Sequence, residues 1–394
     1  MVPANLSDRM EDNRFKAASE VKNKNLPHHL KQLNDDEYFS EELLGLHPSE
    51  SQHFAGIAQE TFRLFEQATD KIISERGLSY LNIPPFFHSV IEKTWKNREE
   101  NPFLYGRFDI NGGLDGKEAK TIEFNADTCT SLPETIHWQD IQLKELGGNS
   151  TQFNSLFDDL KTCLTKIKSR FSFDDPFIVA SSFGHKEDII NCNIVLDAGR
   201  DAGFNCYYCD LEQLTFSEDG IFYDVGGEYQ PVDVWFKLIP WDWIFNEEPN
   251  LAKELIHIIE KKQCVILNPP YTAIWQNKKF LAYITQHFPN RVIAETYTDK
   301  SYLRGEYVQK PIYGRMGENI RVVSNMENET SGGDYETQEK VYQAYYPLLK
   351  DGENYYYQLG FFYTTQPSAI NFRAQPSKII TDDCEFMSHY IITY

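Results

Sequence analysis

The stretch YGRFDINGGLDGKEAKTIEFNADTCTSLPETIHWQ, residues 105–139, predicts the element around which this protein is organised. Two runs with strand-like alternation, 104–110 and 120–125, flank a turn-rich segment, which is typical of a β-hairpin. Successive side chains of a strand point to opposite faces, so Arg107 and Asp109 share one face of the first strand. Glu123 and Asn125 share one face of the second. The pattern therefore predicts that polar atoms from both strands converge on one point.

These residue types suit a hard divalent cation with a phosphate beside it. Asp109, Glu123 and Asn125 offer oxygen ligands, and Arg107 offers a planar guanidinium that matches phosphate geometry. The alternative is a solvated polar face on an amphipathic hairpin, and the residues alone leave both interpretations open. The segment that follows, residues 126–131, is small and hydroxyl-rich, as substrate loops and helix N-caps often are.

Composition limits the class of protein and of partner. The chain has 394 residues, enough for two or three packed lobes, and 41% of them are apolar, as in a globular protein. The formal net charge of -21 argues against nucleic acid or an anionic membrane as a partner and favours cationic ligands such as amines. No apolar run is long enough to span a bilayer, and the polar start has no apolar signal region, so we expect a cytoplasmic protein.

The seven cysteines are expected to be reduced thiols, because their number is odd and their spacing gives no disulfide framework. Cys206 and Cys209 have CxxC spacing, which is also found in redox and zinc sites. Such a site needs a second pair or a helix N-terminus beside it, and neither is visible in the sequence. Buried strand thiols are the favoured interpretation of this pair.

Periodicity divides the chain into four predicted parts. The first is a polar, helical arm, residues 1–45, and the second, 46–174, has helices near 49–76, 86–95, 132 onward and 155–171 around the hairpin. In the third part, strands at 176–181, 205–209, 232–238 and 264–267 alternate with helices at 187–202 and 250–261. This order predicts a small parallel α/β domain over 175–270. The fourth part, 271–394, has a helix at 278–287 and then antiparallel strands near 306–310, 319–324, 340–345, 358–364 and 369–373.

A second group of polar residues lies in this last part. Lys310 ends a strand and is followed by a flexible loop that contains Gly314, Arg315 and Gly317. A strand-end lysine and exposed loop amides are able to hold and cover a polyphosphate. Lys278 is a candidate for a second phosphate lysine. The alternatives are a structural Gly-x-x-Gly turn and a solvated helix residue.

Taken in order, these motifs resemble the synthetase part of the glutathionylspermidine synthase family, a group of ATP-grasp carboxylate–amine ligases. The hairpin is similar to the family's Arg-x-Asp element followed by Glu-x-Asn-Ala-Asp-Thr. Further similarity lies in Pro240-Trp241-Asp242-Trp243, Asn268-Pro269-Pro270, Asn277-Lys278, the lid loop Lys310–Asn319 and the strand Ile370-Asn371-Phe372-Arg373. The similarity runs from about residue 45 to the C-terminus. The sequence shows no N-terminal Cys/His amidase domain like that of the bifunctional members, so we expect a protein similar to the short, stand-alone members.

The resemblance implies an α/β protein with a permuted ATP-grasp fold of antiparallel sheets plus a small parallel, pre-ATP-grasp-like domain. The fold is permuted because the metal residues precede the lysines in the chain. Residues 46–174 would form the N-terminal ATP-grasp portion, 175–270 the pre-ATP-grasp-like domain and 271–394 the ATP-grasp lobe. Asp109, Glu123 and Asn125 would hold Mg²⁺, and Arg107 and Arg373 would stabilise the transferring phosphoryl group.

The same resemblance implies how ATP is bound. Lys278 and Lys310 would hold its phosphates, and the strand 341–345 would line its adenine. The residues expected to complete the nucleotide site are Gly314, Arg315, Gly317 and Gln343.

The implied reaction is ADP-forming amide synthesis, in which a carboxylate is first phosphorylated to an acyl phosphate that an amine then attacks. The acid would be a peptide or an amino acid, and the amine a polyamine. Two other classes of function remain open: a nucleotide-binding pseudoenzyme with a regulatory or scaffolding role, and a CxxC redox protein. The sequence does not indicate the oligomeric state.

Overall fold

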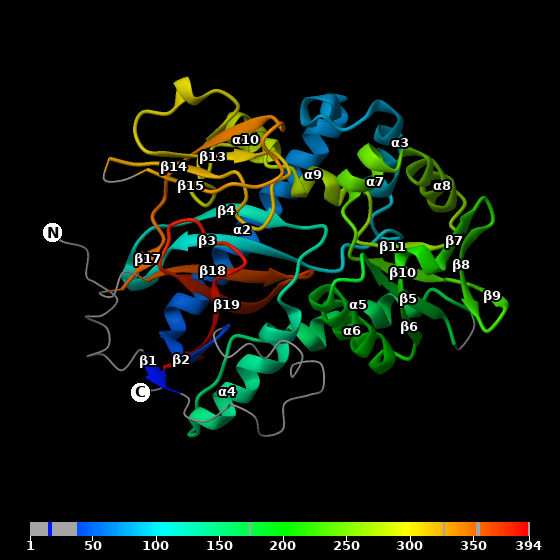
Figure 1. The fold of residues 1–394 in the computed structure, drawn as a ribbon, viewed down its shortest axis with the longest axis horizontal. Coiled ribbons are helices and arrows are strands. Elements are labelled where there is room, and N and C mark those ends of the chain that lie inside the picture. The colour runs from blue at the N-terminus through cyan, green and yellow to red at the C-terminus, as the bar shows by residue number, and fades with distance from the viewer. Residues whose placement is uncertain (1–14, 18–37, 173–174, 326–327, 352–354, 393–394) are drawn as a thin grey trace.

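The computed structural model describes residues 15–17, 38–172, 175–325, 328–351 and 355–392. A mixed sheet carries the predicted hairpin at the centre of the molecule (Figure 1). Its strands lie in the order β1-β2-β20-β19-β18-β3-β4, with β17 paired to β18, and neighbours are antiparallel except for β2 and β20. Their bounds are β1 Phe15–Ala17, β2 Phe39–Leu46, β3 Gly106–Gly112, β4 Ala119–Asn125, β17 Leu349–Lys350, β18 Tyr356–Tyr363, β19 Pro367–Gln375 and β20 Glu385–Ile391.

The prediction of a polar, helical arm over residues 1–45 is wrong where the structure describes it. Both described pieces are strands, and β2 lies inside the central sheet beside β20. Leu43 and Leu44 of β2 are fully buried, and Phe39 stacks on Trp138 with ring centroids 3.9 Å apart. These tertiary contacts override the helical propensity of the Glu-Glu-Leu-Leu run. Residues 1–14 and 18–37 lie outside the described part of the chain.

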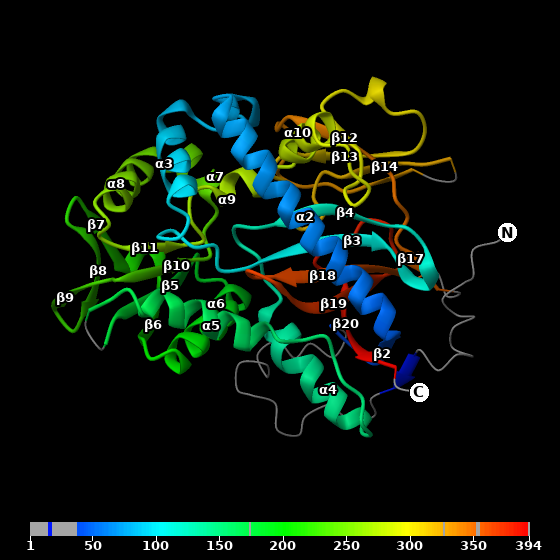
Figure 2. The same cartoon turned by 180° about the vertical axis from the view of Figure 1, so that it is seen from behind.

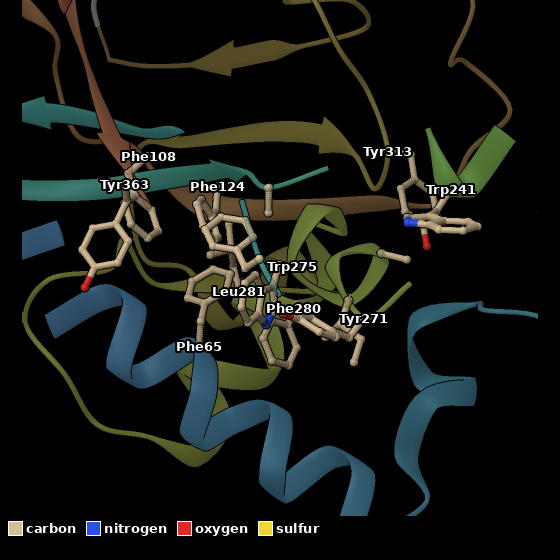
Figure 3. Packing of buried hydrophobic residues seen from close by; sticks show 14 of the residues in the cluster. Phe65, Phe108, Phe124, Trp241, Tyr271, Trp275, Phe280, Leu281, Tyr313 and Tyr363 are labelled. Atoms are coloured by element: carbon tan, nitrogen blue, oxygen red, sulfur yellow. The ribbon is translucent and has the colours of Figure 1, made fainter. Parts of the chain in front are cut away.

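The helix predicted for 49–76 is confirmed as α2, Pro48–Ser74, which crosses one face of the central sheet (Figure 2). Beneath it, Phe108 of β3 stacks on Phe124 of β4 with ring centroids 3.9 Å apart, and Phe65 of α2 meets Phe124 edge-on (Figure 3). Trp275, from α9 Thr272–Gln276, stacks on the same ring. One face of the hairpin is therefore fixed in an aromatic core, which leaves its other face for polar groups.

A second sheet is parallel throughout and has the order β11-β10-β5-β6. The strands are β5 Phe177–Ser182, β6 Asn205–Asp210, β10 Val234–Lys237 and β11 Val265–Leu267, which confirms the four predicted there. Three antiparallel strands that the sequence analysis did not predict lie between β6 and β10. They are β7 Leu214–Ser217, β8 Gly220–Val225 and β9 Glu228–Pro231.

A further sheet has the order β12-β16-β13-β14-β15. Its strands are β12 Thr296–Tyr297, β13 Tyr307–Pro311, β14 Arg321–Val323, β15 Glu329–Thr330 and β16 Lys340–Ala344. The antiparallel strands predicted after residue 300 all form, but they divide between two sheets, because β18 and β19 join the hairpin. Residues 271–394 therefore contribute to both sheets, and the domain bounds given above stay a prediction.

The remaining helices flank these sheets. They are α3 Pro85–Lys96, a π-helical turn Glu134–Trp138 that continues into α4 Gln139–Leu146, α5 Leu156–Lys168, α6 Lys186–Asp201, α7 Trp241–Glu247, α8 Pro249–Glu260 and α10 Lys279–His287. Short 3₁₀ turns lie at Gly77–Leu81, Leu114–Gly116, Leu211–Gln213 and Lys300–Tyr302. Within the described ranges, none of the helices has the length and apolarity needed to cross a membrane.

The position of β2 gives a stability prediction. Replacing the fully buried Leu44 by alanine should lower the free energy of unfolding by about 2–5 kcal/mol, because it leaves a cavity under the central sheet. Urea denaturation measures the loss, and Glu60→Ala, on the exposed side of α2, is the control. Equal stability of the two variants would contradict a buried β2.

Candidate active site

The polar face of the hairpin forms as its sequence pattern predicts. Arg107 lies opposite Asn125, and Asp109 lies opposite Glu123 in the antiparallel register. Asp109 is only 5% exposed, and its position is set by its neighbour Phe108, which points into the aromatic core. Because successive side chains of a strand point to opposite faces, the packing of Phe108 into the core places Asp109 on the polar face.

Asp109 is the centre of a buried ion-pair network. Its Oδ1 accepts a hydrogen bond from Arg107 Nε at 2.8 Å, and its Oδ2 accepts one from Arg373 Nη2 at 2.8 Å. Asn125 Nδ2 also donates to Oδ2, at 3.3 Å. Burial disfavours the charged carboxylate, but the charges of Arg107 and Arg373 outweigh it and hold the pKa of Asp109 below its usual value. The network joins the hairpin to β19.

A β-bulge in the hairpin connects it to the lysine strand. The register shifts after Asp109, so Ile122 has no opposite residue in β3. The Ile122 carbonyl oxygen instead accepts hydrogen bonds from Gln343 Nε2 at 3.1 Å and from Lys310 Nζ at 3.4 Å. Gln343 Oε1 in turn accepts from Lys310 Nζ at 2.9 Å. Gln343, expected to line the adenine, thus lies beside the ammonium group of Lys310.

Lys278 reaches the same place from the start of α10. Its Nζ lies 3.0 Å from Glu123 Oε1 and donates to the Gly314 carbonyl at 2.6 Å. Lys278 is 3% exposed and Lys310 is 4% exposed, so neither is the solvated residue that its local sequence allows. Burial, reinforced by the charge of Lys278 and opposed by those of Glu123 and Asp109, lowers the pKa of Lys310 to about 8.

The predicted lid loop connects β13 to β14 and makes specific contacts. Arg315 donates through Nη1 to Asp242 Oδ2 at 3.2 Å and through Nη2 to Oδ1, which ties the loop to α7. The two glycines are required by space, because a Cβ at Gly314 would lie 2.4 Å from Pro311 Cγ. A Cβ at Gly317, which has a φ of +70°, would lie 2.4 Å from the Ile380 carbonyl oxygen. That this loop moves as a lid stays a prediction.

A buried ion pair that was not predicted from the sequence supports the hairpin. Lys237 Nζ donates to Asp127 Oδ1 at 2.7 Å, and the backbone N–H of Trp241 donates to Asp127 Oδ2 at 2.7 Å. Both charged side chains are inaccessible to solvent. The sequence does contain a signal for this pair, which is the single lysine in the otherwise apolar strand Val234–Lys237. A lysine in a buried strand is expected to have a charged partner, because lysine is almost never fully buried unless it is paired. This pair holds the segment just after Asn125 against the parallel sheet.

The donor set of the hairpin fits Mg²⁺ bound together with a phosphate. Within the described part of the chain, no three His, Cys, Asp or Glu residues group as metal ligands. Asp109, Glu123 and Asn125 instead present two carboxylates and one amide on a single face. Magnesium is usually held by one or two carboxylates together with substrate phosphates and water, so this partial set suits it.

The cysteines match the interpretation as buried thiols. All seven are free and buried, including Cys206 and Cys209 on β6. Burial raises the pKa of Cys206 to about 12 and that of Cys209 to about 11, which keeps both thiols protonated at neutral pH. A reactive CxxC site needs the opposite shift, so nothing in the geometry supports the redox alternative.

Comparison with known proteins gives the following similarities. Residues 9–392 match the family described as glutathionylspermidine synthase preATP-grasp. A Haemophilus influenzae protein provisionally named an acid–amine ligase is 31% identical over 238 residues, 59% of this chain and 58% of that protein. The bifunctional glutathionylspermidine synthetase/amidase of Escherichia coli is 24% identical over 334 residues, 77% of this chain and 52% of that protein. The chain thus spans about half the length of the curated relatives that it matches.

The fold also has a solved counterpart. The apo form of a glutathione synthetase-like effector from Globodera pallida aligns with a TM-score of 0.54, covering 97% of this chain and 94% of the other, at 10% sequence identity. This similarity concerns the fold alone. It agrees with the mixed α/β architecture of several sheets described above.

The lowered pKa of Lys310 predicts a pH dependence of stability. The folded lysine loses its proton near pH 8, whereas in the unfolded chain it does so near its ordinary value of about 10.4. Below pH 8 the folded state therefore bears the cost of a buried ammonium group, and this cost disappears as the pH rises from 8 to about 10.4. The wild type should gain up to about 3 kcal/mol of stability relative to Lys310→Met across this window.

Urea denaturation of both proteins between pH 7 and 10.5 measures this difference. Lys144→Met is the control, because the Lys144 side chain is 73% exposed and its substitution should give a pH-independent difference. Parallel stability curves for wild type and Lys310→Met would show that the pKa of Lys310 is not lowered.

Proposed function

Because the chain belongs to the glutathionylspermidine synthase family, we propose that it is an ATP-dependent ligase that joins a carboxylate to an amine. The observation that carries the proposal is the meeting of polar groups from distant parts of the chain in one buried cluster. Glu123 of the hairpin pairs with Lys278, Asp109 pairs with Arg373, and Lys310 contacts the hairpin at the Ile122 carbonyl. These are the charged groups that phosphoryl transfer from ATP to a carboxylate requires.

The cluster has an excess of buried positive charge, which supports a polyphosphate ligand. Arg107, Arg373, Lys278 and Lys310 carry four positive charges, whereas Asp109 and Glu123 carry two negative ones. The Arg373 and Glu123 side chains are 20% and 16% exposed, and the other four groups are buried. An unbalanced buried charge is costly unless a ligand pairs with it. ATP together with one or two Mg²⁺ ions supplies negative phosphates for the cations and a metal for the two carboxylates. We assign Asp109, Glu123 and Asn125 to the metal.

The lysines and arginines divide the work of phosphoryl transfer in this proposal. Lys278 and Lys310 hold the ATP phosphates, after Lys278 exchanges the Gly314 carbonyl for a phosphate oxygen. Arg107 and Arg373 approach Asp109 from β3 and β19, so their remaining N–H groups can stabilise charge on the transferring phosphoryl group. Mg²⁺ held by Asp109, Glu123 and Asn125 would neutralise negative charge on the phosphates. Gln343 keeps Lys310 in place.

A carboxylate does not acylate an amine directly, so the proposed reaction first activates it. A carboxylate oxygen attacks the γ-phosphorus of ATP, the bond to ADP breaks, and an acyl phosphate forms. An amine then attacks the acyl carbon, and phosphate leaves with the electron pair of the broken C–O bond. Water must be kept from the acyl phosphate, and we propose that the loop around Gly314, Arg315 and Gly317 closes over it as a lid.

For the substrates, we propose a peptide or amino acid as the acid and a polyamine as the amine. Relatives are named glutathionylspermidine synthetase and trypanothione synthetase, which supports acids and amines of these classes. The net charge of -21 supports a cationic amine as well. We also propose the permuted ATP-grasp arrangement, since the hairpin precedes both lysines, and a pre-ATP-grasp-like role for the parallel sheet. A cytoplasmic location belongs to the same proposal.

The function is tested by a screen of substrate pairs. Glutathione, dipeptides and amino acids, each combined with spermidine, putrescine or amino acids, should include a pair that releases phosphate from ATP in the presence of magnesium. Release should require both the acid and the amine, and mass spectrometry should find the amide. Tight binding of an ATP analogue without turnover of any pair would contradict the ligase proposal and indicate a nucleotide-binding protein.

Substitution of the two arginines tests their catalytic role. Arg107→Lys and Arg373→Lys should each reduce turnover about 100-fold or more, equivalent to about 2.7 kcal/mol, because lysine keeps the charge but loses the planar fork. Melting temperatures should change little, since lysine can still pair with Asp109. The matched control is Arg200→Lys, an arginine in an exposed ion pair with Asp197. Near-normal turnover in both site variants would assign Arg107 and Arg373 to stability alone.

A further inference from the structure

Three buried side-chain atoms next to the proposed phosphoryl site have no hydrogen-bond partner in the described part of the chain: Glu134 Oε2, Asn371 Oδ1 and Arg373 Nε. Glu134 is 5% exposed and Asn371 is 1% exposed. A buried polar atom without a partner costs about 1–3 kcal/mol, so such atoms point to a missing ligand where they gather at one site.

Asn371 contacts the region around Arg107, and Glu134 follows through its chain neighbour Thr135 and lies within range of the charge of Arg107. A Cβ placed on Gly360 would lie 2.3 Å from Asn371 Oδ1 and 2.8 Å from Arg107 Cδ, so these two side chains flank the same bare glycine. Asn371 Nδ2 donates to Thr135 Oγ1 at 2.8 Å, and Thr135 is the neighbour of Glu134 in the chain. Asn371 and Arg373 lie two residues apart on β19 and so share a face of that strand.

The Glu134 carboxylate accepts a hydrogen bond from a tyrosine. Its Oε1 accepts a hydrogen bond from the Tyr38 hydroxyl at 2.7 Å, which leaves Oε2 as the unpartnered atom. Glu134 begins the helical segment that follows the hydroxyl-rich loop 126–131, and Leu132 N donates to Asn191 Oδ1 at 3.0 Å, which anchors that loop. Burial raises the pKa of Glu134, so it accepts a proton more readily than an exposed carboxylate.

The three unpartnered atoms are one hydrogen-bond donor and two acceptors. Arg373 Nε is a donor and suits the oxygens of a phosphate, in line with its proposed role. Glu134 Oε2 and Asn371 Oδ1 are both acceptors, so neither can hydrogen-bond to an anionic group that has no donor. An ammonium group, which has three N–H donors and one positive charge, satisfies both acceptors at once, and its charge suits the one that is a carboxylate.

From this arrangement we infer that Glu134 binds the attacking ammonium group of the amine substrate and accepts a proton from it, with Asn371 Oδ1 as the second acceptor. This inference rests on the proposed function and adds to it the residue that makes the amine nucleophilic. A protonated amine has no lone pair for attack, so a base beside the acyl phosphate is required.

The step balances as follows. The ammonium group gives one proton to Glu134 Oε2, and the neutral amine attacks the acyl carbon. The C–N bond forms, the C–O bond to the phosphoryl group breaks, and phosphate leaves with that electron pair. The second nitrogen proton passes to the departing phosphate, and Glu134 releases its own proton to solvent. The net products are an amide, hydrogen phosphate and one proton.

Glu134→Gln tests the inference, because glutamine keeps the size of the side chain but cannot act as a base. Wild type and variant are compared with the acid identified in the screen, once with spermidine and once with hydroxylamine. Hydroxylamine is uncharged at neutral pH and traps acyl phosphates as hydroxamates without a base. The variant should lose amide formation with spermidine by 100-fold or more and keep hydroxamate formation within about threefold.

The control is Glu50→Gln, the same change at a carboxylate that is 6% exposed and accepts hydrogen bonds from the backbone of His47 and Asp115. It should leave the ratio of the two products unchanged. If Glu134→Gln forms the spermidine amide at the wild-type rate, or loses amide and hydroxamate equally, the inference is overturned while the ligase proposal stands. If the wild type forms neither product with any acid, the ligase proposal itself fails.

Discussion

The pairing of Asp109 with both Arg107 and Arg373 is the interaction on which the polar site depends. The position of Asp109 is fixed on one side by its neighbour Phe108, which stacks on Phe124 in the core beneath α2. It is held from above by two guanidinium groups that come from β3 and β19. The charges of these two cations, with the hydrogen bond from Arg107, hold the pKa of Asp109 below its usual value in spite of its burial. The same pairing keeps the arginines in position for a ligand.

One backbone irregularity extends this arrangement to the next sheet. The bulge at Ile122 turns a carbonyl toward Lys310 and Gln343, and β4 also pairs along its edge with residues 292–294. Lys278 then closes the group through Glu123 and Gly314. Charges from four segments are thereby brought together without a single helix or loop carrying the whole site. These ion pairs hold the charged groups in place before any ligand enters, as the proposed binding of phosphates and metal requires.

Much of this could be predicted from local patterns. The alternation in β3 and β4 placed Arg107, Asp109, Glu123 and Asn125 on one face, since strand geometry leaves no other choice. The parallel strands were visible as short apolar runs between helices. The path of residues 38–46 was not predictable, because β2 becomes a strand through its pairing with β20 and its contact with Trp138.

Contacts between distant segments were equally hidden in the sequence. The burial of Lys278 and Lys310 depends on sheets that meet only in the folded chain, and the local sequence of each fits an exposed residue as well. The Lys237–Asp127 pair had a local signal in its apolar strand, whereas Glu134 had none, since a glutamate at a helix start is ordinary. Which side chains pair across sheets depends on how the strands are arranged in the fold, and the periodicity of the sequence does not reveal that arrangement.

The central claim is that the carboxylate is activated by phosphorylation at the Asp109–Arg107–Arg373 cluster. The most direct measurement uses an acid substrate labelled with ¹⁸O in its carboxylate and follows the label by mass spectrometry. The account predicts that each phosphate released during amide formation carries one ¹⁸O, because the carboxylate oxygen that attacked ATP leaves with the phosphoryl group. Amide formation with unlabelled phosphate would contradict it.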